Sequence, residues 1–114
     1  MTTIYHNPRC SKSRQTLELL KTNNIEPEVV LYLETPPTKS KLKSIITLLD
    51  ISPRELLRKS EDAYKTNNLK NKDLSDEQLL DFMLEFPKLI ERPIVIHDNK
   101  AVLGRPPENV LEII

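Results

Sequence analysis

A strand that passes into a helix through a short polar turn is the feature that most constrains how this chain can fold. Ile4 and Tyr5 are typical of a strand, and Pro8 fixes a turn. The segment from Ser11 to Asn23 has no Gly or Pro and is predicted to be a helix of about three turns. The only cysteine, Cys10, stands where the strand gives way to the helix. Because the first amides of a helix lack partners and the helix dipole is positive there, this position favours an anion.

Cys10 can supply that anion as a thiolate. Arg9, Lys12, Arg14 and His6 lie within a few residues of it and add positive charge. A thiol in such a setting can have its pKa lowered from about 8.5 to roughly 3.5–7.5, and the thiolate is the nucleophile. A lone cysteine is often a small buried hydrophobe, but the polar residues around Cys10 disfavour that alternative. We therefore predict that Cys10 is a catalytic nucleophile.

His6 and Ser13 each have two interpretations. His6 either ends the first strand or, as an imidazolium four residues before Cys10, helps to hold the thiolate. Ser13 is either a helix-capping residue or part of a cradle in which backbone amides bind an oxyanion.

Other cysteine and phosphate motifs do not fit the spacing. A dithiol redox motif needs a second cysteine where this chain has Ser13, and a tyrosine-phosphatase loop needs an arginine where it has Thr16. A glycine-rich phosphate loop is excluded because Gly104 is the only glycine. A nucleophilic cysteine without a second thiol cannot resolve its own adduct as a disulfide, so an external thiol is required.

The composition is that of a single globular domain. The chain has 114 residues, of which 38% are hydrophobic and 30% are charged. The 17 basic residues balance 17 acidic ones, so no basic field favours nucleic acid or an acidic membrane. One cysteine and two histidines make a structural zinc site improbable, and we predict no metal. No apolar run reaches the roughly 20 residues of a membrane span, and the first residues resemble a strand instead of a secretion signal, so we expect a cytoplasmic protein.

The hydrophobic pattern predicts an α/β fold. The run Val29–Leu33 is typical of a strand buried on both faces, which completes a βαβ unit. Residues 38–86 change to a helical pattern and form a helical insertion. Three helices are predicted there: the first is capped by Thr38, the second begins at Asp50–Pro53, and the third is capped by Ser75. Residues 60–73 are predicted to form a polar surface connection.

Strand-like sequence resumes after the insertion. Ile94–Ile96 and Ala101–Leu103 are predicted to pair as a hairpin around Asp98-Asn99. A last helix begins at Pro106 or Pro107 and turns inward its apolar residues Val110, Leu111 and Ile114. The expected architecture is a four-stranded mixed sheet flanked by helices on both sides.

Three arginines are candidates for binding an anion. Arg92 precedes Pro93, Arg105 precedes Pro106, and Arg58 follows a pair of leucines. Each can also be an ordinary solvated charge, and this applies most to Arg58. If the sheet places these loops beside Cys10, the guanidinium groups can hold a tetrahedral oxyanion through bidentate hydrogen bonds.

These residues resemble the glutaredoxin-coupled arsenate reductase family, which is ArsC-like and belongs to the thioredoxin-like superfamily. The matching pieces are Tyr5–Cys10 with Ser13-Arg14, Leu31–Glu34 with Pro36-Pro37, Leu56–Lys59, Asp81–Met83, Arg92–Val95 and Gly104–Pro106. The resemblance implies one thioredoxin-like domain over residues 1–114, with the helical insertion between strands two and three, and a cis peptide at Arg92-Pro93.

The resemblance also implies roles for single residues. Cys10 is then the nucleophile and His6 the histidine that stabilises its thiolate, while Arg58, Arg92 and Arg105 bind the oxyanion, with Ser13 beside them. Cys10 attacks arsenate, glutathione captures the adduct as a co-substrate, and glutaredoxin supplies the electrons that release arsenite. The resemblance implies no bound cofactor, and we expect a monomer.

Two other functions are weighed against this one. Spx-type regulators use the same fold to bind RNA polymerase without catalysis, but they usually have two cysteines in the loop, and Ser13 argues against them here. A reductase of another oxyanion or of a mixed disulfide is the third possibility, because tetrahedral oxyanions present nearly the same oxygens.

Overall fold

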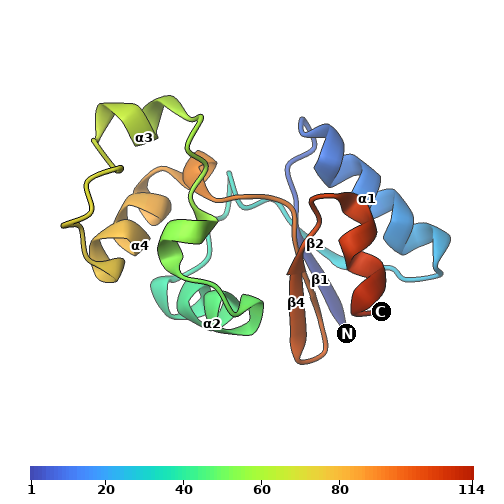
Figure 1. Cartoon of the computed structure of the whole chain (residues 1–114). Helices are drawn as coiled ribbons and strands as arrows, with labels where there is room; N and C mark the ends of the chain where they lie inside the picture. Colours follow the sequence, from blue (N-terminus) through green and yellow to red (C-terminus); the bar gives the residue numbers. More distant parts are fainter. The chain divides into compact units, whose positions relative to one another are not determined.

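The structure, a computed structural model, describes residues 1–114, and its chain divides into two compact units. The first unit comprises residues 1–35 and 92–114, and the second comprises residues 36–91 (Figure 1). The predicted helical insertion, 38–86, falls within the second unit. That the chain is a single domain stays a prediction. None of the helices has the length and apolar character needed to cross a membrane.

The first unit holds the sheet and two helical segments. Its elements are β1 (Thr2–Tyr5), α1 (Ser11–Thr22), β2 (Glu28–Val30), β3 (Ile94–His97), β4 (Lys100–Leu103) and the 3-10 helix η3 (Pro107–Glu112). The second unit is helical, with α2 (Lys39–Leu49), η1 (Pro53–Leu56), α3 (Asp62–Thr66), α4 (Asp76–Glu85) and η2 (Pro87–Leu89).

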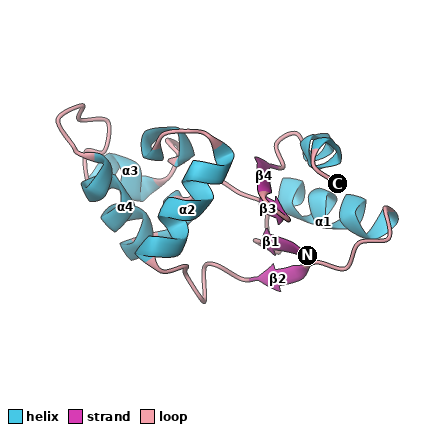
Figure 2. Cartoon of the chain, turned by 90° about the horizontal axis from the view of Figure 1, so that it is seen from below, coloured by secondary structure: helices cyan, strands magenta, loops and turns pink.

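The sheet has four strands in the order β2-β1-β3-β4 (Figure 2). β1 pairs in parallel with β2 and antiparallel with β3, so that Ile4 lies between Val29 and Val95. β3 and β4 form the predicted hairpin, whose turn residue Asp98 has a φ of 54°. The predicted α/β class with a mixed sheet flanked by helices is confirmed.

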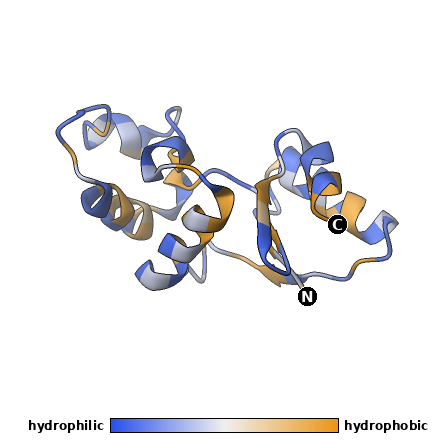
Figure 3. Cartoon of the chain, turned by 60° about the horizontal axis from the view of Figure 1, so that its bottom comes forward, coloured by the Kyte–Doolittle hydropathy of each residue, from blue (hydrophilic) through white to orange (hydrophobic).

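A small aliphatic core joins the sheet to the helices of the first unit. Ile4, Leu20, Val95 and Val110 are fully buried and pack together, one from each of β1, α1, β3 and η3. The strands accordingly carry apolar residues (Figure 3). Removing these side chains from water is the main force that holds α1 and η3 to the sheet.

The last helix differs from the prediction in its period. It is a 3-10 helix, which has three residues per turn, so Pro107 and Val110 share its buried face. Leu111, which an α-helical period would turn inward, is 47% exposed. The prediction that Leu111 is a core residue is therefore wrong.

The second strand is shorter and more exposed than predicted. β2 covers only Glu28–Val30 and lies at the edge of the sheet, and Val29 is 43% exposed. The chain then turns, because the amides of Glu34 and Thr35 both donate to the carbonyl of Leu31. The prediction of a strand buried on both faces through Leu33 is wrong.

The helical unit confirms two of the predicted helix starts. Thr38 caps α2 by accepting from the Lys41 amide, and Ser75 forms a capping box with Gln78 at the start of α4. Each helix has an apolar and a hydrophilic side (Figure 3). The buried residues of the two helices are Leu42, Ile45 and Ile46 of α2 and Leu79, Leu80 and Met83 of α4.

Two parts of the helical unit were not predicted. The helix expected from Asp50–Pro53 is the single 3-10 turn η1. The segment expected to be a polar surface connection contains α3, and its Leu69 is fully buried. Ala63, Tyr64 and Leu69 are too few and too irregularly spaced in this polar segment to give a period from which the burial of Leu69 can be predicted.

Gly104 lies in a tight contact at the end of β4. A Cβ there would lie 2.5 Å from Thr16 Oγ1 and 2.8 Å from Pro93 Cγ. The Gly104 amide donates to the Pro93 carbonyl at 2.9 Å, and Thr16 Oγ1 donates to the Gly104 carbonyl at 3.2 Å. Only glycine therefore fits at this position without a steric clash.

We predict that Gly104→Ala lowers the free energy of unfolding by about 1–3 kcal/mol, because the added methyl group overpacks a closed contact. Urea denaturation followed by circular dichroism measures the change. Lys100→Ala, on the exposed start of β4, is the control and should change stability by less than about 0.5 kcal/mol. A Gly104→Ala variant as stable as this control would contradict the packing described here.

Candidate active site

The loop between β1 and α1 is held in one shape by backbone hydrogen bonds. The His6 amide donates to the Val30 carbonyl of β2 at 2.9 Å, which ties the start of the loop to the sheet. The Cys10 amide donates to the Asn7 carbonyl at 3.0 Å, and the Arg9 amide donates to Asn7 Oδ1 at 3.0 Å. These bonds fix the backbone that leads directly into Cys10.

Ser13 is the side chain that joins this loop to the helix. Its Oγ lies 2.6 Å from His6 Nδ1 and accepts from the Asn7 amide at 3.0 Å. Ser13 is completely buried, and His6 and Asn7 are nearly so. Ser13 thus holds the first turn of α1 against the loop. Both His6 and Ser13 lie at the predicted site, and Asn7 is a positioning residue for which the sequence pattern predicted no role.

The sheet brings Arg92 and Arg105 to the end of β1 that leads to Cys10. Tyr5, at the end of β1, pairs with Ile94, and Ile94 pairs with Leu103. The residues just before β3 and just after β4 therefore share this end of the sheet. Peptides at Arg92-Pro93 and Arg105-Pro106 are both cis, which confirms the first prediction and adds a second.

Arg105 reaches the sulfur directly. Its Nη1 donates to Cys10 Sγ at 3.9 Å and to the Arg92 carbonyl at 3.4 Å. The side chain of Arg105 is exposed, and Cys10 is half-buried. A guanidinium in this position can also hold an oxygen of an anion bound at the sulfur.

The surroundings of Cys10 lower the pKa of its thiol. Burial raises this pKa, but hydrogen bonds from the Ser13 amide, the Arg92 guanidinium and the Lys12 amide, together with the charge of Arg92, outweigh burial. The two amides belong to the first turn of α1, where they have no partners within the helix. The structure therefore supports the prediction that the helix start favours the thiolate. The cation that lowers this pKa is Arg92, whereas the sequence had pointed to the charges of Arg9, Lys12, Arg14 and His6.

The surroundings of His6 favour its neutral ring. Burial lowers the pKa of His6, and the charges of Arg14 and Lys21 lower it further. An imidazolium is thus disfavoured at neutral pH, and the contact that the structure gives His6 is with Ser13. A role for His6 in stabilising the thiolate stays a prediction, and its position supports an action through Ser13.

Arg58 belongs to the second unit. Its Nη1 lies 3.0 Å from Glu91 Oε1, and its Nε lies 3.5 Å from Glu61 Oε1. Its amide also donates to the Leu89 carbonyl at 2.7 Å. The structure gives Arg58 a fixed place in the helical unit, and its assignment to the oxyanion site stays a prediction.

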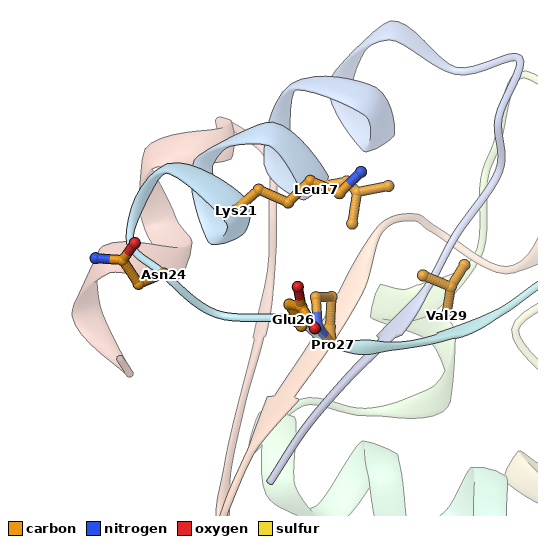
Figure 4. Close-up of a pocket in the computed structure, with 6 residues that line it drawn as sticks. All are labelled: Leu17, Lys21, Asn24, Glu26, Pro27 and Val29. Atoms are coloured by element: carbon orange, nitrogen blue, oxygen red, sulfur yellow. The ribbon is translucent and has the colours of Figure 1, made fainter.

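A cavity in the first unit lies away from Cys10. It has a volume of about 730 Å³, and Leu17, Lys21, Glu26 and Val29 are among the residues that line it (Figure 4). Lys21 lies ten residues beyond the start of α1, or roughly 15 Å along a helix that rises 1.5 Å per residue. This cavity is therefore separate from the candidate active site.

The sheet, the loop and the two arginines define a class of protein. They form a thioredoxin-like fold in which one cysteine, at the start of the first helix, is surrounded by amide and guanidinium donors. Comparison with protein families matches residues 5–113 to the ArsC family. The chain belongs to this family.

Individual relatives agree with this assignment. The protein YfgD of Escherichia coli, which is described as uncharacterised, is 58% identical, and the match covers 97% of this chain and 94% of the relative. An arsenate reductase of Haemophilus influenzae is 49% identical, and the match covers 97% of this chain and 97% of the relative. The solved structure of an arsenate reductase from Vibrio cholerae is 50% identical, with a TM-score of 0.97 and coverage of 99% of this chain and 97% of that one.

We predict that Arg92→Gln makes Cys10 less reactive near neutral pH. Arg92 lowers the pKa of the thiol by hydrogen bonding and by charge, so its loss raises that pKa and shifts alkylation by iodoacetamide to higher pH. The pH dependence of the alkylation rate, followed by mass spectrometry, measures the shift.

The matched control is Lys100→Gln, which removes one positive charge at the other end of β1, beside His97 and Thr2. It should leave the alkylation profile unchanged. Equal shifts in the two variants would mean that general surface charge, and not a contact of Arg92, controls the sulfur.

Proposed function

We propose that this protein reduces arsenate to arsenite, with glutathione as co-substrate and glutaredoxin as the source of electrons. The observation that carries the proposal is the contact between Arg105 Nη1 and Cys10 Sγ at 3.9 Å, beside the Arg92 guanidinium. It joins a nucleophile to groups that bind oxyanions. Relatives that share about half of the sequence and nearly its whole length are named arsenate reductases.

The first step is attack of the Cys10 thiolate on arsenic. A sulfur–arsenic bond forms, and one arsenate oxygen leaves as hydroxide or, after protonation, as water. No electrons are transferred to arsenic in this step. Arg92 and Arg105 offset the negative charge of the oxygens, and the Lys12 and Ser13 amides of α1 add to the positive potential at the sulfur.

The later steps need thiols from outside the chain, because Cys10 is its only cysteine. The sulfur of glutathione displaces a second oxygen from arsenic. Glutaredoxin then attacks the glutathione sulfur and forms a mixed disulfide with it. The electron pair of the broken sulfur–arsenic bond reduces arsenic, and hydrolysis releases arsenite and restores the Cys10 thiolate. The low-potential glutathione pool that this cycle uses is that of the cytoplasm, where we place the protein.

We expect Cys10→Ser to abolish arsenate-dependent oxidation of glutathione in an assay with purified glutaredoxin. A hydroxyl does not ionise near neutral pH, and no other thiol can replace it. Ser11→Ala, which alters the neighbouring exposed hydroxyl, is the control that should retain turnover. Substantial turnover by Cys10→Ser, or no turnover of arsenate by the unaltered protein, would refute the proposal.

Arg105→Ala is expected to raise the KM for arsenate and to lower kcat/KM by roughly tenfold to a hundredfold, the loss typical of a charged hydrogen bond to a substrate. Steady-state kinetics with varied arsenate measures both constants. Lys100→Ala provides the control, since this lysine is exposed on the same hairpin. Similar kinetics of the two variants would show that Arg105 does not bind arsenate.

A further inference from the structure

A second, smaller cavity adjoins the loop that carries Cys10. Its volume is about 280 Å³, just below the lower end of the range of about 300–1,000 Å³ typical of small-molecule sites. One wall is the loop from His6 to Arg9, which ends at the residue before Cys10. The other wall is formed by Leu31, Leu33 and Glu34, which follow β2.

Both walls of this cavity are held in place. The Arg14 guanidinium donates to the Pro8 carbonyl at 2.9 Å, which adds to the hydrogen bonds of Asn7 and Ser13 within the loop. On the other side, the Leu31 carbonyl accepts from two amides, and the intervening Tyr32 is buried. The cavity is therefore preformed.

The cavity and the arginines lie on different sides of Cys10. β1, which leads into the cysteine loop, has β2 on one side and β3 on the other. The wall at Leu31 continues from β2, whereas Arg92 and Arg105 flank β3 and β4. An oxyanion held by the arginines therefore leaves the cavity on the β2 side open to a second reactant.

The lining has the chemistry of a charged peptide site. Arg9 and Glu34 are exposed and supply one positive and one negative charge. Leu31 is 37% exposed and supplies apolar surface to the same lining. A ligand that fits has a carboxylate, an ammonium group and an aliphatic stem.

We propose that this cavity binds glutathione. This proposal rests on the proposed function. Arg9 pairs with a glutathione carboxylate, Glu34 pairs with its α-ammonium group, and the side chain of Leu31 packs against its stem. The thiol of the bound peptide is directed toward Cys10, the residue that follows the cavity wall. The cavity thereby selects the external thiol that a chain with one cysteine requires.

Thiol–disulfide exchange tests this proposal without arsenate. The Cys10 thiolate attacks one sulfur of glutathione disulfide, a Cys10–glutathione disulfide forms, and the other glutathione leaves as a thiolate. Mass spectrometry of the intact chain follows the reaction, because Cys10 is the only site. Hydroxyethyl disulfide, which is uncharged, reports the intrinsic reactivity of the same thiolate.

Arg9→Gln and Glu34→Gln are each expected to slow the reaction with glutathione disulfide by about threefold to fivefold, the upper range for an exposed ion pair. The double variant should lose about tenfold or more, because separate contacts add in free energy. The ratio of the rates with glutathione disulfide and hydroxyethyl disulfide removes any effect of Arg9 on the thiol itself. This ratio must fall in the variants.

Lys21→Gln and Glu26→Gln are matched controls, because they make the same charge changes in the separate cavity of Figure 4. They should leave the ratio unchanged. An unchanged ratio in the Arg9 and Glu34 variants, or an equal fall in the controls, overturns the glutathione site. Arsenate turnover by the unaltered protein is measured separately in the same preparation. Absence of that turnover would contradict the proposed function, whereas an unchanged ratio would contradict only the glutathione site.

Discussion

The hydrogen bonds that join the cysteine loop to the first turn of α1 are the constraint on which the site depends. Ser13 Oγ contacts both His6 and the Asn7 amide, and the Asn7 carbonyl accepts from the Cys10 amide. The sulfur is thereby held where the amides of Lys12 and Ser13 can donate to it. These two amides add positive potential from fixed positions, which need no rearrangement when an anion arrives.

The sheet adds the second part of the site. Because β1, β3 and β4 are neighbours, the segments that carry Arg92 and Arg105 meet at the end of β1 that leads to Cys10. Gly104 permits this closure, since its carbonyl and amide contact Thr16 and Pro93 where a larger residue would not fit. Residues almost a hundred positions apart thus form one site.

Local sequence patterns predicted those elements whose conformation depends mainly on residues close together in the chain. The helix after Cys10, the hairpin around Asp98 and the caps at Thr38 and Ser75 all follow from short-range rules and are confirmed. The extent of β2 was not predictable, because exposure at a sheet edge depends on what packs beside it. The neutral state that burial favours for His6 was also missed, since burial is a property of the folded chain.

The ionisation state of Cys10 tests the account most directly. Carbon-13 NMR of protein labelled in cysteine gives one Cβ resonance, because Cys10 is the only cysteine, and its chemical shift follows the thiol across a pH titration. The account predicts a midpoint below the value of about 8.5 for an unperturbed cysteine. A midpoint at or above that value would show that burial outweighs the amides and Arg92, and it would contradict the account.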